Sequence, residues 1–96
     1  MARHDVYRAF GTYLLDCQSD YLGNLDTRFV VPLLPEGEVP KVHRLNPVFR
    51  IEGERLVMAT QLGSSLPARN LRSPVASLAD QHDVIMNAFD MLLSGY

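Results

Sequence analysis

The segment Tyr13-Leu14-Leu15-Asp16-Cys17-Gln18 has the two-residue period of a β-strand that is buried on one face. Its odd-numbered residues form an apolar face, whereas Asp16 and Gln18 lie on the other face. A second run of the same kind follows at Arg28-Phe29-Val30-Val31-Pro32-Leu33-Leu34, where Pro32 is typical of a sheet edge or a bulge because proline lacks an N–H. These two runs predict that the fold is built on a sheet.

Outward from this pair, the pattern predicts more short strands. The first strand is expected to begin at Tyr7 and to be interrupted near Gly11, and residues 35–46 read as a long surface loop. Gly63-Ser64-Ser65 is expected to break a strand. The remaining strands are expected at Val48–Ile51 and Arg55–Thr60, which would form a hairpin, and at Ala68–Leu71. This spacing is typical of a small barrel or a curled sheet.

The last quarter of the chain predicts a helix. Ser77 followed by Asp80 resembles a capping box, no Gly or Pro intervenes up to Leu93, and Gly95 stands where a C-terminal cap is expected. At 100° per residue, one face carries Ile85, Ala88, Phe89, Leu92 and Tyr96. Further apolar residues flank this face, so the apolar arc is wider than one small barrel needs. We therefore expect a homodimer; the alternative is that the barrel wraps further round the helix.

The end of this helix is predicted to be electronegative. No Lys or Arg occurs between Ser77 and Tyr96, whereas Asp90 lies near the terminal carboxylate. An acidic helix end beside an aromatic side chain suits a protein partner that brings Arg or Lys. The alternative is a solvated acidic end without a partner.

Length and composition set the limits of the fold. The chain has 96 residues, which allows one domain over 1–96, and its formal charge of −2 argues against a protein that coats nucleic acid. The single cysteine excludes an intrachain disulfide, the three histidines lack a zinc-ligand spacing, and no cofactor motif is present. With no signal peptide or apolar run of membrane-spanning length, a cytoplasmic location without membrane contact is expected.

The candidate chemical groups favour a binding module over an enzyme. Asp16 and Asp20 would stand roughly 13 Å apart on an extended strand, too far to share a proton. Cys17 lies on an apolar face, which predicts a buried and inert thiol. His43 and His82 have no ligand or triad partner at a diagnostic spacing.

Several segments resemble the CcdB family of bacterial toxins over nearly the whole chain. The resemblance is carried by Asp16-Cys17-Gln18-Ser19-Asp20, by Arg28-Phe29-Val30-Val31-Pro32-Leu33 and by Pro47-Val48-Phe49-Arg50-Ile51. It continues in Met58-Ala59-Thr60 and Ser65-Leu66-Pro67. The two motifs Gln-Ser-Asp and Val-x-Pro-Leu, in this order, are fairly specific to this family.

The resemblance implies a fold that is mostly β with a C-terminal α-helix, a small SH3-like barrel shared with MazF-type toxins. It implies a homodimer, a CcdA-like antitoxin as partner, and DNA contact only through the antitoxin complex. The implied target is the DNA gyrase A subunit, which such a toxin inhibits by binding, without catalysis. The family's gyrase-binding positions map onto Tyr21, Leu22, Asp90, Ser94, Gly95 and Tyr96. No antitoxin contact is assigned to a residue.

One departure from the family pattern keeps other functions open. The known gyrase poison ends in Trp-Gly-Ile, whereas this chain ends in Ser94-Gly95-Tyr96 and contains no tryptophan. The first alternative is a CcdB-like protein with weakened or lost gyrase poisoning that retains antitoxin binding and autoregulation. The second is a MazF-like endoribonuclease, for which Arg28, Thr60 and Arg50 are the plausible contributors.

Overall fold

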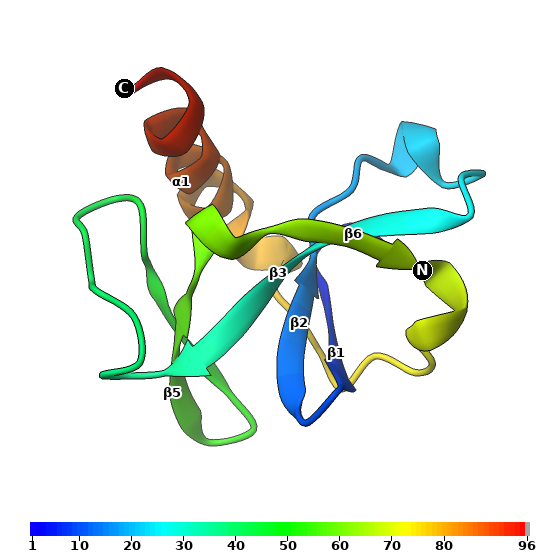
Figure 1. Ribbon diagram of the computed structural model, residues 1–96, viewed down its shortest axis with the longest axis horizontal. Helices are drawn as coiled ribbons and strands as arrows, with labels where there is room; N and C mark the ends of the chain where they lie inside the picture. Colours follow the sequence, from blue (N-terminus) through cyan, green and yellow to red (C-terminus); the bar gives the residue numbers. More distant parts are fainter. Residues whose placement is uncertain (96) are drawn as a thin grey trace.

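The computed structural model describes residues 1–95, so the predicted site residue Tyr96 lies outside the described residues. Within that range the chain forms a curled, nearly closed seven-stranded sheet and a C-terminal helix, α1 (His82–Ser94) (Figure 1). The strands are β1 (Asp5–Ala9), β2 (Thr12–Asp16), β3 (Thr27–Pro35), β4 (Val48–Ile51), β5 (Glu54–Met58), β6 (Ser64–Pro67) and β7 (Ala76–Ser77). Their order is β4-β5-β3-β2-β1-β7, and β6 also pairs with β3. The predicted fold class is confirmed.

Strand β3 joins the two parts of the sheet. Along one side it pairs with β2, and along the other its first half pairs with β6 and its last residues with β5. Pro32 lies at the change of partner, and its carbonyl accepts a 2.9 Å hydrogen bond from the Ala59 N–H. The proline nitrogen faces the same side as this carbonyl, where neither partner strand requires a donor. A proline is therefore tolerated in the middle of a central strand.

The core lies between the curled sheet and α1. Tyr13 and Leu15 of β2 pack there, as the two-residue period predicts, together with apolar residues of β3, β4 and β5. From α1, Ile85 and Ala88 enter this core and are fully buried. The Phe89 ring contacts the Phe29 ring of β3, with 6.2 Å between the ring centres. The helix is thus fixed by a narrow strip of its surface.

One predicted strand is wrong. Ala68–Leu71 does not pair in the sheet: Ala68–Asn70 forms a single 3-10 turn, and the strand before it is β6. The segment Gly63-Ser64-Ser65 was expected to break a strand, but it leads into strand β6. The serines lie on the exposed surface of β6, where no apolar period is required, and their backbone pairs with Val30 and Phe29 of β3.

The start of the helix also differs from prediction, whereas its end agrees. A 3-10 turn at Ala79–Gln81 precedes α1, and the Ser77 hydroxyl accepts a hydrogen bond from the Ala79 N–H, so no capping box forms. At the other end Gly95 has φ 78° and its N–H donates to the Met91 carbonyl at 3.1 Å. This left-handed conformation is one that glycine adopts without strain.

Candidate functional site

Two groups of exposed residues make up the candidate site, and the first lies just after β2. There a 3-10 turn, η1 (Asp20–Leu22), is capped by the Ser19 hydroxyl, which accepts a 3.2 Å hydrogen bond from the Tyr21 N–H. The Tyr21 side chain is 98% exposed, and Leu22 and Leu25 are about half exposed. A small apolar surface with an aromatic ring at its tip is therefore displayed to solvent.

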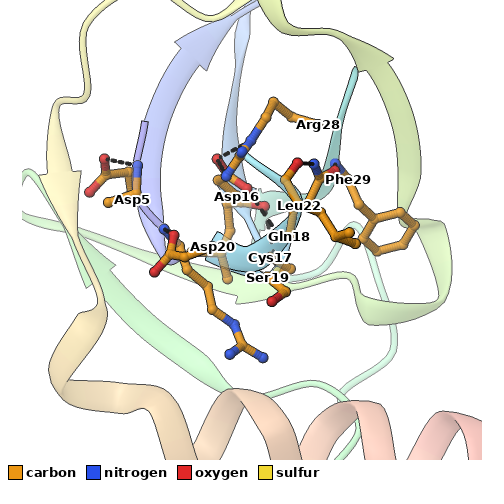
Figure 2. A network of polar contacts seen from close by, with 12 residues as sticks. Asp5, Asp16, Cys17, Gln18, Ser19, Asp20, Leu22, Arg28 and Phe29 are labelled. Carbon is orange, nitrogen blue, oxygen red and sulfur yellow. Dashed lines mark hydrogen bonds and ion pairs between the residues drawn. The ribbon is translucent and has the colours of Figure 1, made fainter. Parts of the chain in front are cut away.

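A buried ion pair lies beneath this turn (Figure 2). Both Nε and Nη2 of Arg28 reach Oδ2 of Asp16, at 2.8 and 2.7 Å, and both side chains are almost completely buried. The other carboxylate oxygen, Oδ1, accepts a 3.1 Å hydrogen bond from the Gln18 N–H. Burial raises the pKa of the Asp16 carboxyl, while the hydrogen bonds from Gln18 and Arg28 oppose that rise. The pair joins β2 to β3 where the chain leaves the sheet to form η1.

The second group is the C-terminal end of α1. Asp90, Ser94 and Gly95 are exposed there, and the helix also exposes Leu92 (41%) and Leu93 (78%). Figure 1 shows this end of the helix and η1 in well-separated parts of the molecule. A single protomer therefore does not bring the two predicted groups of site residues together.

The family of the chain follows from comparison with known proteins. The family model described as "CcdB protein" matches residues 3–95. The chain belongs to the CcdB family. No match to a curated protein was found.

In this CcdB-family chain, the other candidate groups to consider are a metal site and the Cys17 thiol. No group of three or more His, Cys, Asp or Glu within residues 1–95 could hold a metal ion. Burial raises the pKa of the Cys17 thiol to about 12, as expected for an inert thiol. Over the same range, no helix has the length and hydropathy that crossing a bilayer requires.

The residues considered for RNA cleavage are not presented as a basic groove. Arg28 is buried against Asp16, and Thr60 is buried with its hydroxyl donating to the Leu45 carbonyl at 2.5 Å. Arg50 is exposed and donates to the Gly53 carbonyl. Two of the three side chains are thus unavailable to a phosphate.

Sequence reasoning missed the ion pair that supports η1 in this CcdB-family chain. Asp16 and Arg28 are separated by 12 residues and lie on different strands, so no short-range pattern connects them. A signal was present, however: Asp16 ends one apolar run and Arg28 begins another. A charged residue at such a position is expected to have a buried partner of opposite charge.

Proposed function

We propose that this chain is the toxin of a type II toxin–antitoxin system and inhibits DNA gyrase by binding its A subunit and trapping the cleaved complex. The observation that carries the proposal is the family match over residues 3–95. The toxin acts by binding and performs no catalysis of its own. A cytoplasmic site of action follows, because the target works on the chromosome.

Tyr21 is the aromatic group best suited to the target contact. An arginine of the target stacked on an exposed tyrosine ring gives about 0.5–2 kcal/mol of binding free energy. Such a contact would compensate for Ser94, which stands where the family's poison carries tryptophan. Leu22 adds apolar area next to the ring, and Asp90 offers a carboxylate for a target cation.

A homodimer supports the same function. Leu92 and Leu93 are neighbouring apolar side chains near the end of α1, and they are 41% and 78% exposed; exposed apolar neighbours of this kind mark a candidate protein contact. A second copy covers this area through a two-fold contact. The dimer would then present two equivalent copies of each surface to the symmetric target.

The partner in the resting cell is a CcdA-like antitoxin. The small barrel leaves Tyr21 and the α1 end exposed, so a tightly bound partner is required to keep the toxin inactive. DNA is reached only through this antitoxin complex, in keeping with the formal charge of −2. No antitoxin contact is assigned to an individual residue.

The proposal is tested by inducing the protein in bacteria and recovering gyrase covalently bound to cleaved DNA. Wild type is expected to stop growth and to accumulate these complexes, whereas Tyr21→Ala and Asp90→Ala are expected to weaken both effects while remaining folded. Phe10→Ala is the matched control, because Phe10 is also a well-exposed aromatic residue, at 73%, on the β1–β2 turn. Equal killing by all four proteins would remove Tyr21 and Asp90 from the site.

Two other outcomes identify the alternatives. Normal growth under strong expression, together with tight antitoxin binding, would assign the chain to CcdB-like proteins that have lost gyrase poisoning. Growth arrest with cleaved cellular RNA and no trapped gyrase would indicate a MazF-like endoribonuclease. The burial of Arg28 and Thr60 disfavours this second outcome.

A further inference from the structure

The side chains of the segment that carries Tyr21 do little to attach it to the barrel. All residues from 20 to 26, which we call the display segment, are exposed, so no side chain of the segment is buried. A backbone hydrogen bond of 2.9 Å from the Leu22 N–H to the Ser19 carbonyl curls the chain locally. This hydrogen bond does not join the segment to the sheet. A fixed position for Tyr21 therefore requires attachments from residues outside the segment.

Gln18 provides such an attachment through both ends of its side-chain amide (Figure 2). Its Oε1 accepts a 2.9 Å hydrogen bond from the Phe29 N–H of β3, and its Nε2 donates a 2.8 Å hydrogen bond to the Leu22 carbonyl. The side chain is only 8% exposed. Because one partner is a donor and the other an acceptor, the orientation of the amide is fixed. One buried group thus connects the display segment to a central strand.

The buried ion pair holds the base of this connection in place. The Gln18 N–H donates to Asp16, and Phe29, which donates to the Gln18 side chain, directly follows Arg28 in β3. The Gln18 backbone and the Phe29 end of the bridge therefore both adjoin residues that the Asp16–Arg28 pair fixes. A buried hydrogen bond with rigid ends loses less free energy to side-chain ordering than a flexible surface contact.

The other attachments lie at the two ends of the display segment. Asp20 accepts a 3.0 Å hydrogen bond from the Arg3 N–H, and the Asp26 carbonyl accepts a 2.8 Å hydrogen bond from the Ala68 N–H. The contact of Gln18 with Leu22 is made next to Tyr21 itself. It is therefore the attachment that acts on the exposed ring most directly.

We propose that Gln18 is a positioning residue, which holds the display segment in one conformation so that Tyr21 is ordered before it meets its target. The part of this inference that concerns the target rests on the proposed gyrase contact. Ordering in the free protein removes an entropic cost from binding. Loss of the Gln18 bridge is therefore expected to loosen the segment and to weaken target binding, without removing any group that touches the target.

The first test measures the segment in the free protein. Because the chain contains no tryptophan, Tyr21→Trp introduces a single tryptophan at the tip of the segment, which is excited selectively at wavelengths that tyrosine does not absorb. Adding Gln18→Met, which keeps the side-chain length but removes both hydrogen bonds, is expected to speed the nanosecond decay of fluorescence anisotropy. In the otherwise wild-type chain, the same substitution is expected to speed hydrogen exchange of the Leu22, Gly23 and Leu25 amides about tenfold.

Asn46 offers a matched control. Its side chain is also buried, at 4% exposure, and its amide nitrogen donates to the Met58 carbonyl and to Gln61 at 3.0 and 2.8 Å. It attaches the loop 36–46 and not the display segment. Asn46→Leu is expected to lower global stability to a similar degree while leaving the anisotropy at position 21 and the exchange of the Leu22 amide unchanged.

The outcome for gyrase separates this inference from the proposed function. The comparison of wild type with Tyr21→Ala tests the target contact. Gln18→Met is expected to reduce affinity for the gyrase A subunit about tenfold. Anisotropy in the Tyr21→Trp protein that is unchanged by Gln18→Met, together with exchange equal to that of wild type, would overturn the positioning role, whatever the result with gyrase. A loosened segment with unchanged gyrase affinity would overturn its role in target binding.

A second variant keeps the test valid if Gln18→Met does not fold. Gln18→Glu retains the acceptor for the Phe29 N–H but replaces the donor to the Leu22 carbonyl by an oxygen. It is expected to loosen the segment at Leu22 while the Phe29 amide stays protected from exchange. Protection of the Leu22 amide equal to that of wild type would contradict the positioning role.

Discussion

The carboxylate of Asp16 and the guanidinium of Arg28 meet at 2.7 Å, with side chains that are 0% and 2% exposed. The pair joins β2 to β3 and sits at the root of the segment that displays Tyr21. Removal of either partner of such a buried pair is strongly destabilising, because the other charge is left buried without compensation. It links the stability of the barrel to the geometry of the candidate site.

Removal of one partner tests the role of this pair in stability. Arg28→Met leaves the Asp16 charge buried without compensation, so we expect a loss of about 3–5 kcal/mol in the free energy of unfolding, measured by urea denaturation. The double variant Asp16→Leu/Arg28→Met should recover part of the loss. Arg50→Met is the control, because Arg50 is exposed, and it should change stability by less than about 0.5 kcal/mol. An equal loss of stability in Arg28→Met and Arg50→Met would contradict the role of the buried ion pair.

The sequence predicted most of the sheet because burial imposes a period on it. Strands β2, β3 and β5 and the end of α1 were found because apolar residues alternate in the strands and because Gly95 ends the helix. Strand β6 was missed because its serines are exposed and only backbone pairing with β3 defines it. Backbone pairing of a polar edge segment leaves no mark on the local sequence.

Only the exposed members of the candidate site could be predicted from the sequence. Its exposed members, such as Tyr21 and Asp90, came from the resemblance to a family. The supporting residues Gln18 and Arg28 act through contacts between strands that are distant in sequence. Such contacts depend on the register between paired strands, which the local sequence of one strand does not specify.

Stability is expected to fall in mild acid because of His4. Burial lowers the pKa of His4 below its ordinary value of 6.5, with further lowering by Arg3 and His82 and an opposing effect of Asp20. The unfolded chain therefore binds more protons just below pH 6.5, so the free energy of unfolding decreases as the pH drops through this value. The measurement is urea denaturation between about pH 8 and about pH 5.

Substitution of His4 checks the origin of this pH dependence. His4 has φ 73°, a conformation that asparagine tolerates, so His4→Asn should fold and show a flatter pH profile than wild type. His43→Asn is the control, because His43 is an exposed residue of the loop 36–46, and it should retain the wild-type slope. A His4→Asn profile that is as steep as wild type would assign the acid sensitivity to other groups.

The Cys17 thiol is expected to be unreactive in the folded protein. A pKa of about 12, caused first by burial, lowers the thiolate fraction about a thousandfold relative to a thiol with a pKa of 9.0. Reaction with a disulfide reagent near pH 8 should therefore be at least about a hundredfold slower in the native protein than in urea. A native rate close to the unfolded rate would show that the strand opens readily at this position.

The exposed apolar side of α1 at Leu92 and Leu93 is expected to form the contact between two copies. Leu93→Asp places a charge on a side chain that is 78% exposed, so it should dissociate the dimer with little effect on the protomer fold. Phe10→Asp changes a residue of similar exposure on the distant β1–β2 turn and should leave the dimer intact. Sedimentation velocity distinguishes the two, and a Leu93→Asp protein that stays dimeric would place the interface elsewhere.

The central claim is tested most directly by DNA cleavage with purified components. Gyrase, supercoiled plasmid and this protein are incubated with ATP, and protein-linked cleaved DNA is measured after denaturation and protease treatment. We expect cleaved DNA to increase with the concentration of wild type, and to require about ten times more of the Tyr21→Ala variant. A folded protein that, at saturating concentration, neither binds the gyrase A subunit nor leaves cleaved DNA would contradict the account.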